Sequence, residues 1–248
     1  MKLRLPVIIR IVVLALLAAL LWAPQNFAGL FAPFTKFGQP PLYTQSSLLS
    51  LTISHLEIVA VATVLSTILA VGCAIFVTRP FGRDFLPLSR SIANIGQTFP
   101  PVAVLAICVP ILGFGTPPTL VALFLYGLLP IFENALTGLT TIAPEVAEAA
   151  RGVGMTGFQR LIKVELPLAL PIILAGIRLS IVISIATATI GSTVAAHTLG
   201  EIIIAGLTTD NTAWVLEGGL VVAVLAVLIY DGLAALERRL VVRTGRAG

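Results

Sequence analysis

The side chains best suited to metal, redox or nucleophilic chemistry are few and scattered in this chain. Cys73 and Cys108 lie in apolar runs, without CxxC spacing and without a neighbouring histidine, so we interpret them as small packing residues. His55 and His197 lie near the expected outer ends of hydrophobic runs, where a polar interface residue is a simpler interpretation than a ligand. Serine, histidine and acid do not form a recognisable nucleophile motif. The sequence therefore predicts neither a catalytic site nor a metal site.

Phosphate-binding chemistry is missing as well. A nucleotide held by its phosphates needs a glycine-rich GxxxxGK[ST] loop, whose backbone N–H groups and lysine cradle the phosphate oxygens. The chain contains no such stretch. We therefore expect that it binds no cofactor, and that any ATP hydrolysis it depends on belongs to a partner.

A polar segment, EVAEAARGVGMTGFQRLIKVELP, residues 145–167, lies between two of the most hydrophobic runs of the chain. It carries three acids and three bases in a chain that is only 10% charged. Pro144 and Glu145 favour the start of a helix here. Three glycines then follow within six residues, Gly152, Gly154 and Gly157. Because such a cluster permits a sharp turn, we expect a first helix to Arg151 and a second short helix that ends at Pro167.

Two short helices at an angle can dock on another protein. The apolar residues of the second helix fall mostly on one side, while its bases lie elsewhere: Phe158, Leu161, Ile162 and Val164, against Arg160 and Lys163. This arrangement suits a docking element. The alternative is an ordinary amphipathic loop in the lipid interface, and residue types alone do not separate the two.

The rest of the chain is far more apolar than a soluble domain. Hydrophobic residues make up 58% of its 248 residues, against roughly 45–50% in typical soluble proteins. They occur in long blocks, which indicate membrane spans of about 20 residues. The net charge of +4 does not indicate a nucleic-acid partner, because the bases lie between the apolar blocks and not on an amphipathic face.

We expect an all-α integral membrane protein with about six transmembrane helices. The expected spans are 7–23, 54–78, 98–114, 118–137, 168–196 and 213–236. The third is short and contains Pro100, Pro101 and Pro110, which predicts a kinked or partly broken helix. The first could be a signal peptide, but no convincing cleavage site follows Trp22, so we expect an uncleaved span.

The distribution of bases predicts the orientation. With a cytoplasmic N-terminus, thirteen of the fifteen bases lie inside, while Lys36 lies outside and Arg178 lies within a span. Since cytoplasmic segments are enriched in Lys and Arg, both termini and the 145–167 segment are expected in the cytoplasm. The chain then has three parts: an N-terminal span with an outer segment (1–50), a core domain containing the charged loop (51–240) and a cytoplasmic tail (241–248).

The charged segment resembles the EAA motif of bacterial ABC-importer permeases. The match comprises Glu148, Ala149, Ala150, Gly154, Val164, Leu166 and Pro167. Only Val164 departs from the motif, which usually has isoleucine there. In that family the loop forms coupling helices that insert into a cleft of the ATP-binding subunit. The resemblance implies that this chain is not an enzyme, that ATP and Mg lie on the partner, and that Glu145 and the motif residues other than Val164 couple to it.

Over about residues 48–240 the chain resembles the permeases of osmoprotectant uptake systems, which import glycine betaine, choline, carnitine and related quaternary amines. The stretches that carry this resemblance are NIGQTFPPVAVLAICVPILGFG, LFLYGLLPIFENALTGL and ELPLALPIILAGIRLS. After the fifth span, Ala195, Ala196 and His197 stand where glycine and other small residues are common in the family. The implied location is the bacterial inner membrane. The implied partners are ABC ATPase subunits, a periplasmic or lipid-anchored substrate-binding protein, and a second permease copy or paralogue.

Other functions remain open at this stage. Permeases for an amino acid such as methionine share the EAA loop and are the nearest alternative. A stand-alone secondary transporter and a non-transporting membrane scaffold are more distant ones. We find no internal repeat that would make six spans a complete two-half transporter, so a translocation pathway would need a second subunit.

Polar residues inside spans are candidates for a translocation pathway, because placing them in hydrocarbon is costly. On the fifth span, Ser184 and Thr187 share a face; close helix packing through small residues is the alternative. Gln97 and Phe99 precede the broken third span, where an aromatic ring could contact a quaternary amine. Both pairs are candidate pathway residues.

Arg178 and Asp231 are expected on the cytoplasmic halves of the fifth and sixth spans. An unpaired charge at that depth costs at least about 2.5 kcal/mol. We therefore predict that the two form an intramembrane ion pair or share a polar network. The alternative is that the arginine extends to lipid phosphates and does not meet the acid.

The predicted orientation can be tested with single cysteines in a background without Cys73 and Cys108. Cysteines replacing Thr35 and Thr209 should react with an impermeant thiol reagent added to intact cells. A cysteine replacing Thr156 should react only after the membrane is permeabilised. Labelling of the Thr156 position in intact cells would contradict the orientation.

Overall fold

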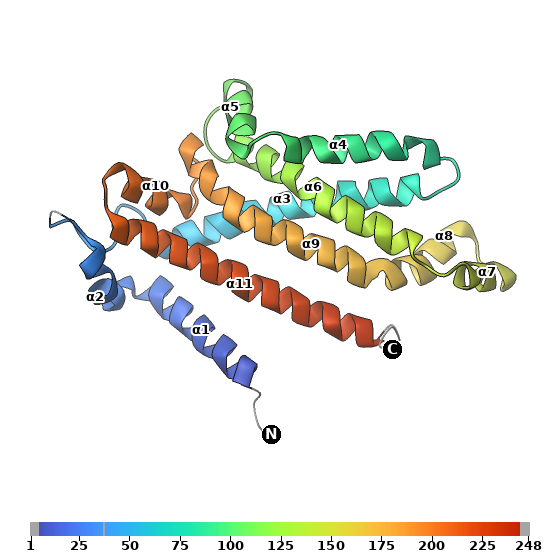
Figure 1. Ribbon diagram of the computed structural model, residues 1–248, viewed down its shortest axis with the longest axis horizontal. Helices are drawn as coiled ribbons and strands as arrows, with labels where there is room; N and C mark the ends of the chain where they lie inside the picture. The colour runs from blue at the N-terminus through green and yellow to red at the C-terminus, as the bar shows by residue number, and fades with distance from the viewer. Residues whose placement is uncertain (1–4, 37, 244–248) are drawn as a thin grey trace. The chain divides into compact units, whose positions relative to one another are not determined.

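A computed structural model describes residues 5–36 and 38–243 of the chain, and the regular structure among them is entirely helical (Figure 1). These residues form two compact units. The first comprises Met1–Val61, Pro101–Ala122 and Ser184–Ile229, and the second comprises Ala62–Pro100, Leu123–Ile183 and Tyr230–Gly248. Each of the four long helices contributes residues to both units, so the units are not separate stretches of sequence.

The first unit contains the N-terminal helices and the segments around the last loop. Its elements are α1 (Leu5–Trp22), η1 (Pro24–Phe27), α2 (Ala28–Phe31), η2 (Ala32–Phe34), the start of α3 (Leu48–Val77), α5 (Pro101–Leu112), the start of α6 (Thr116–Thr140), the end of α9 (Leu166–Ala188), η5 (Thr189–Val194), α10 (Gly200–Thr208) and most of α11 (Thr212–Arg243). Its core packs Leu51, Leu199 and Ile202 against Ala213 and Val221, all fully buried.

The second unit contains the remainder of the long helices and the charged loop. Its further elements are η3 (Arg83–Phe85), α4 (Leu86–Thr98), α7 (Pro144–Gly152), α8 (Gly157–Arg160) and a π-helical turn η4 (Leu161–Glu165). Its core packs Ala74 of α3, Ile131, Phe132 and Ala135 of α6, and Ala169 of α9. Small residues on facing helices let the backbones approach closely, which is how helices associate in lipid.

The expected membrane architecture is confirmed. Among the described residues, four helical segments are long and apolar enough to cross a membrane, namely Leu48–Val77, Thr116–Thr140, Gly157–Val194 and Thr212–Arg239. Two bent pairs raise the number to six if each is one span: Val7–Trp22 with Pro24–Phe34, and Arg83–Thr98 with Pro101–Leu112. The fold is therefore all-α with four to six spans.

The third span differs in its start from the expected 98–114. The helix begins at Leu86 and bends by 95° between Arg83–Thr98 and Pro101–Leu112. The break at Pro100 was predicted, since proline restricts the residue before it and cannot donate a hydrogen bond. Hydropathy missed α4 because of Arg90, which forms a two-pronged salt bridge at 2.6 and 2.9 Å with Glu133 of α6.

The interpretation of His55 as an interface residue is wrong. Its side chain is fully buried in the first unit. The ring Nε2 lies 3.0 Å from the carbonyl oxygen of Ile185, and the Leu199 N–H donates to Nδ1 at 3.4 Å. Because both ring nitrogens have backbone partners, the imidazole is tolerated inside the unit.

Gly96 holds α4 against α6. A Cβ at this position would lie 2.2 Å from the Leu125 carbonyl oxygen and 2.6 Å from the carbonyl carbon. Since that obstacle is backbone, Gly96→Ala should force the helices apart and destabilise the protein by roughly 1–3 kcal/mol. The measurement is the melting temperature of the monodisperse protein in detergent.

Gly72 of α3 provides the matched control, because a Cβ there would meet nothing within 4 Å. Gly72→Ala should be neutral or stabilising by up to about 1 kcal/mol through its better helix propensity. Equal melting temperatures for the two variants would contradict the close packing of α4 on α6.

Candidate functional site

The first helix of the charged loop forms as predicted. α7 starts with Pro144 at its N-terminus, and Glu145 lies in its first turn, where a carboxylate interacts favourably with the helix dipole. Glu145, Glu148 and Ala149 are exposed, whereas Ala150 is buried. The helix therefore presents two carboxylates on its outer side and packs a methyl group inward.

Gly154 is the residue that makes the turn between the two helices. It has φ +81°, whereas neither Gly152 nor Gly157 has a positive φ. The Gly154 N–H donates to the Arg151 carbonyl at 2.9 Å, and the Met155 N–H donates to the Ala150 carbonyl at 3.1 Å. These bonds satisfy carbonyls at the end of α7 in the manner of a helix C-cap. The sequence did not distinguish among the three glycines. The structure shows that, of the three, Gly154 alone has a positive φ.

The second helix begins with a capping box that the sequence analysis did not identify. The Thr156 hydroxyl accepts a hydrogen bond from the Gln159 N–H at 3.2 Å, and the Gln159 side chain accepts one from the Thr156 N–H at 2.9 Å. The pattern Thr-x-x-Gln is readable in a sequence as a helix start. It would have placed the beginning of α8 correctly.

The expectation that the second helix ends at Pro167 is wrong. α8 continues through the π-helical turn Leu161–Glu165 into α9, and Pro167 lies in the first turn of α9. The Leu166 N–H donates to the Leu161 carbonyl, five residues back. A widened turn of this kind adds one residue to the helix. Pro167 then lies in the first turn of α9, where the missing N–H of proline is tolerated.

Glu165 anchors the charged loop to the second unit. Its carboxylate lies 2.5 Å from a terminal nitrogen of Arg79 and 2.8 Å from Nε of Arg160. The three side chains are only 12–21% exposed. Arg79 lies two residues after the end of α3, and its Nε also donates to the Ile75 carbonyl at 3.3 Å. One buried carboxylate thus joins α3 to the end of the loop, and the sequence analysis missed it.

Large apolar side chains on the loop are exposed. Val153 and Phe158 are each 74% exposed, Ile162 is 47% exposed and Val146 is 37% exposed. They lie on the same short segment as the exposed carboxylates of α7 (Figure 1). Exposed apolar residues beside polar ones mark surfaces that contact another molecule. The segment is thus a rigid, mixed surface without substrate or cofactor chemistry.

The candidate pathway residues lie in both units. In the second, the Gln97 side chain donates to the Tyr126 carbonyl at 3.4 Å, and the Tyr126 hydroxyl donates to the Phe99 carbonyl. Gln97 and Phe99 are exposed at the bend between α4 and α5. In the first, Ser184 is buried and Thr187 is half-buried on α9. A pathway role for these four residues stays a prediction.

Arg178 has an acidic partner that the sequence analysis did not consider. Its guanidinium lies 2.7 Å from a carboxylate oxygen of Glu237 and 4.7 Å from the ring centroid of Tyr230. The contact with Glu237 is therefore an ion pair between side chains that are 19% and 22% exposed. The pairing of Arg178 with Asp231 stays a prediction.

Residues 68–242 match a family model described as "Binding-protein-dependent transport system inner membrane component". The match covers more than half of the chain and includes the whole charged loop. The chain belongs to this family. The resemblance to ABC-importer permeases is thereby confirmed, and the coupling role of the charged loop stays a prediction.

Curated relatives in this family are similar over most of their length. The Osmoprotectant import permease protein OsmY of Salmonella typhimurium is 37% identical, with 79% of this chain and 83% of that protein covered. The Glycine betaine/carnitine/choline transport system permease protein OpuCB of Bacillus subtilis is 39% identical, with 77% and 88% covered. The resemblance to osmoprotectant permeases is therefore confirmed.

Solved structures share the fold. A chain of the MetNI methionine ABC transporter, titled as inward facing, has a TM-score of 0.68 at 22% identity and covers 79% of this chain and 99% of its own. A chain of an amino acid ABC transporter has a TM-score of 0.64 at 18% identity, with 77% and 92% covered. At these identities the likeness supports the fold of this permease family and not a substrate.

The Arg79–Glu165 contact predicts a measurable coupling energy. Arg79→Ala leaves the partly buried Glu165 with Arg160 alone, and Glu165→Ala removes the carboxylate from both arginines, so each should lower the stability of the purified protein. The loss of unfolding free energy in the double variant should be smaller than the sum of the losses in the two single variants by about 0.5–3 kcal/mol. The measurement is a double-mutant cycle on thermal unfolding, with protection of the loop from proteolysis as a local readout. Additive effects would show that the two side chains do not interact.

Proposed function

We propose that this chain is the transmembrane permease subunit of an ATP-driven importer of osmoprotectant quaternary amines, such as glycine betaine, choline or carnitine. The observation that carries the proposal is the coupling loop. It combines the EAA residues with a rigid turn, exposed carboxylates and exposed apolar side chains, in a family whose members serve binding-protein-dependent transport. Two relatives at 37–39% identity are named for osmoprotectant transport, which supports the substrate class.

The coupling loop is proposed to dock on an ABC ATPase subunit. Its apolar residues Val153 and Phe158 would fill the partner's cleft, and Glu145 and Glu148 would supply charge complementarity at the rim. ATP and Mg would be held by that partner, and hydrolysis would be its reaction. The part of this chain would be mechanical, because Glu165 passes a displacement of the loop to α3 through Arg79.

The chain is proposed to lie in the bacterial inner membrane with both termini and the coupling loop in the cytoplasm. This orientation follows from the excess of bases on that side. It places the loop where ATP is available. A substrate-binding protein, periplasmic or lipid-anchored, would deliver substrate on the opposite side.

A second permease subunit is proposed to complete the pathway. The relatives OpuCB and OpuCD of Bacillus subtilis, both named for one glycine betaine/carnitine/choline transport system, are 39% and 42% identical to this chain. A system with two permeases is a precedent for a paralogue as partner, and a second copy of this chain is the alternative. The alternative of an amino-acid substrate of the methionine type gains no support from the solved structures, because at 18–22% identity they share only the fold.

The coupling role predicts a selective loss of transport on Gly154→Ala. At φ +81° a side chain is strained by about 1–2 kcal/mol, so the turn should change and α8 should point elsewhere. Uptake of labelled glycine betaine, choline and carnitine should fall by roughly fivefold or more, while the amount of inserted protein stays near normal. Co-purification of the ATPase should weaken in parallel.

Gly152→Ala is the matched control, since Gly152 lies at the end of α7, has no positive φ, and a Cβ there would meet nothing within 4 Å. This variant should transport normally. Normal uptake in the Gly154 variant would contradict the coupling role. If cells with the unaltered chain and its ATPase took up none of the three amines, that result would contradict the substrate class.

A further inference from the structure

Residues 35–36 and 38–47, here called the strap, connect η2 to α3 without regular helical structure. The strap lies outside residues 68–242, the part matched by the family model. It is nevertheless fixed by side-chain contacts to α10, α11 and the turn between them, which lie inside that part. A loop held in one conformation in this way is suited to recognition, because little order has to be gained on binding.

The first half of the strap is attached to the turn between α10 and α11. Lys36 forms a salt bridge of 2.9 Å with Asp210, which has φ +54° in this turn. The Gln39 side chain donates to the Thr209 carbonyl at 2.8 Å, and the Asn211 side chain donates to the Pro40 carbonyl at 3.1 Å. Three successive contacts therefore hold the chain on this turn.

The second half of the strap is anchored by Tyr43, which is buried. Its ring packs edge-on against Trp214, with centroids 5.3 Å apart. Its N–H donates to the Glu217 carboxylate at 2.9 Å, and its hydroxyl donates to Glu201 at 2.9 Å. Burial and the Glu201 carboxylate raise the pKa of Tyr43 to about 12, so the hydroxyl remains a donor at any physiological pH.

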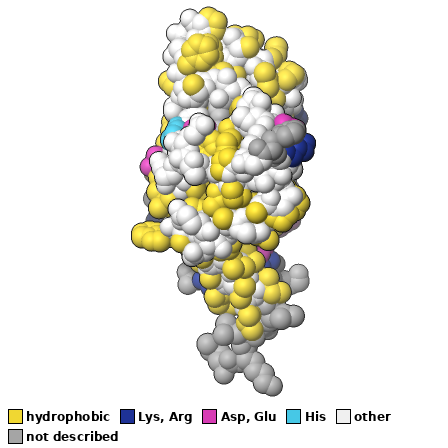
Figure 2. All heavy atoms as spheres, turned by 90° about the vertical axis from the view of Figure 1, so that its left-hand side faces the viewer, with side chains coloured by type: hydrophobic (Ala, Val, Ile, Leu, Met, Phe, Trp, Pro, Cys, Tyr) yellow, Lys and Arg dark blue, Asp and Glu magenta, His cyan; other side chains and the backbone are white. Residues whose placement is uncertain are grey.

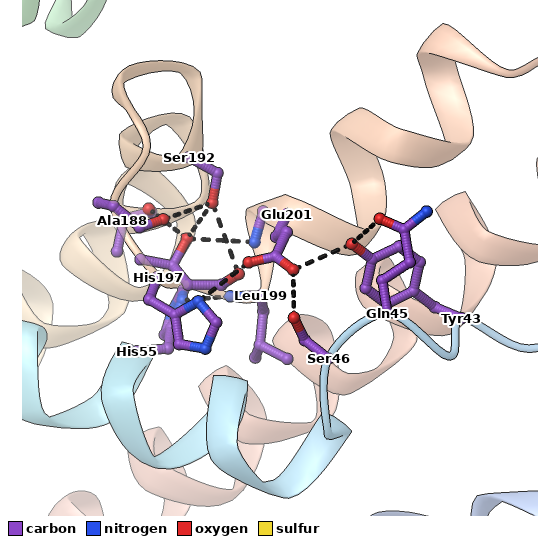
Figure 3. Close-up of polar contacts among 12 residues, drawn as sticks. Tyr43, Gln45, Ser46, His55, Ala188, Ser192, His197, Leu199 and Glu201 are labelled. Carbon is purple, nitrogen blue, oxygen red and sulfur yellow. Dashed lines mark hydrogen bonds and ion pairs between the residues drawn. The ribbon is translucent and has the colours of Figure 1, made fainter. Parts of the chain in front are cut away.

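Glu201 of α10 is the acceptor on which these contacts converge (Figure 3). One of its carboxylate oxygens accepts from the Tyr43 hydroxyl and from the Ser46 hydroxyl, the latter at 2.5 Å. The other lies 3.0 Å from Nδ1 of His197. A single carboxylate thus fixes the strap and the segment after η5 to the same helix, and the carboxylate is itself oriented by three partners.

The outward side of the strap carries little net charge. Its exposed residues include Lys36, Thr44, Gln45 and Ser47 beside Gly38 and Pro40, and the exposed residues of the segment that holds it include His197, Leu207 and Asp210. Figure 2 shows a face on which many hydrophobic side chains are spread, with a few histidine, acidic and basic side chains between them. The single base of the described strap is paired with Asp210, whereas binding to anionic lipid headgroups needs clusters of bases. A surface that mixes uncharged polar groups with apolar ones and has few charges suits another protein.

The side of the membrane also follows from the chain order. The coupling loop precedes α9, whereas the 195–211 segment that holds the strap follows α9. If α9 crosses the membrane once, the strap is on the side opposite to the ATPase. On that side the proposed importer receives its substrate from a protein partner.

We propose that the strap, fixed in place by Glu201, is the surface on which the substrate-binding protein of this importer docks. The inference rests on the proposed function, which supplies that partner. Because the strap lies outside the part matched by the family model, it would select the cognate binding protein, while the matched part carries the machinery that permeases share.

The test measures binding of the purified substrate-binding protein encoded with this permease to the importer assembled with its ATPase in nanodiscs. Glu201→Ala removes the acceptor of three contacts and should weaken binding by about fivefold or more, the equivalent of about 1 kcal/mol. Glu201→Gln keeps an amide oxygen for Tyr43 and Ser46 and should bind nearly as the unaltered protein does. Co-purification of the ATPase should be unchanged in both.

Thr44→Arg is the second probe, because Thr44 is exposed and a bulky side chain there should block docking without disturbing the fold. A photoreactive amino acid at Thr44 should cross-link to the binding protein, and one at Phe158 should cross-link to the ATPase. Full binding in both Glu201→Ala and Thr44→Arg, or no cross-link from Thr44, would overturn this inference alone. Failure of the unaltered importer to bind the substrate-binding protein would overturn the proposed partner and this inference together.

Discussion

The carboxylate of Glu165, enclosed by Arg79 and Arg160, is the interaction on which the coupling loop depends. A carboxylate removed from water must be matched by partners, and here two guanidinium groups provide them. The π-helical turn places Glu165 on the inward face of the helix, in line with the buried Ala169 and Ile173 four and eight residues later. The loop is therefore a rigid extension of α9 that is also attached to α3.

The bilayer restricts polar recognition to the ends of the helices. In hydrocarbon every backbone group must be satisfied internally, so irregular backbone is confined to the loops. Side-chain contacts hold both the coupling loop and the strap in place. In the coupling loop a carboxylate lies between two arginines, and in the strap Glu201 contacts Tyr43, Ser46 and His197. Both surfaces are thereby ordered before a partner arrives, which lowers the entropic cost of association.

The places where expectation and structure differ have a common cause. α4 was missed because Arg90 lowers the local hydropathy, although Glu133 of another helix neutralises it. Pro167 was taken for a helix end because proline usually stops a helix, although the widened turn before it removes the conflict. His55 was placed at an interface because a histidine near a span end is normally hydrated, although two backbone groups satisfy its ring. Each error concerns a local preference that another structural feature overrides: a partner elsewhere in the chain for Arg90 and His55, and the adjacent π-helical turn for Pro167.

By itself the sequence determined the all-α membrane architecture, the break at Pro100 and the sharp turn after α7, because hydropathy, proline geometry and glycine clusters act over a few residues. Only the tertiary structure decided which charges meet: Glu165 with Arg79, 86 residues away, and Tyr43 with Glu201, 158 residues away. Such pairs depend on which helix faces come together. The facing of helices is decided by the packing of small residues such as Gly96 against another backbone. A local sequence pattern does not show which helix that will be.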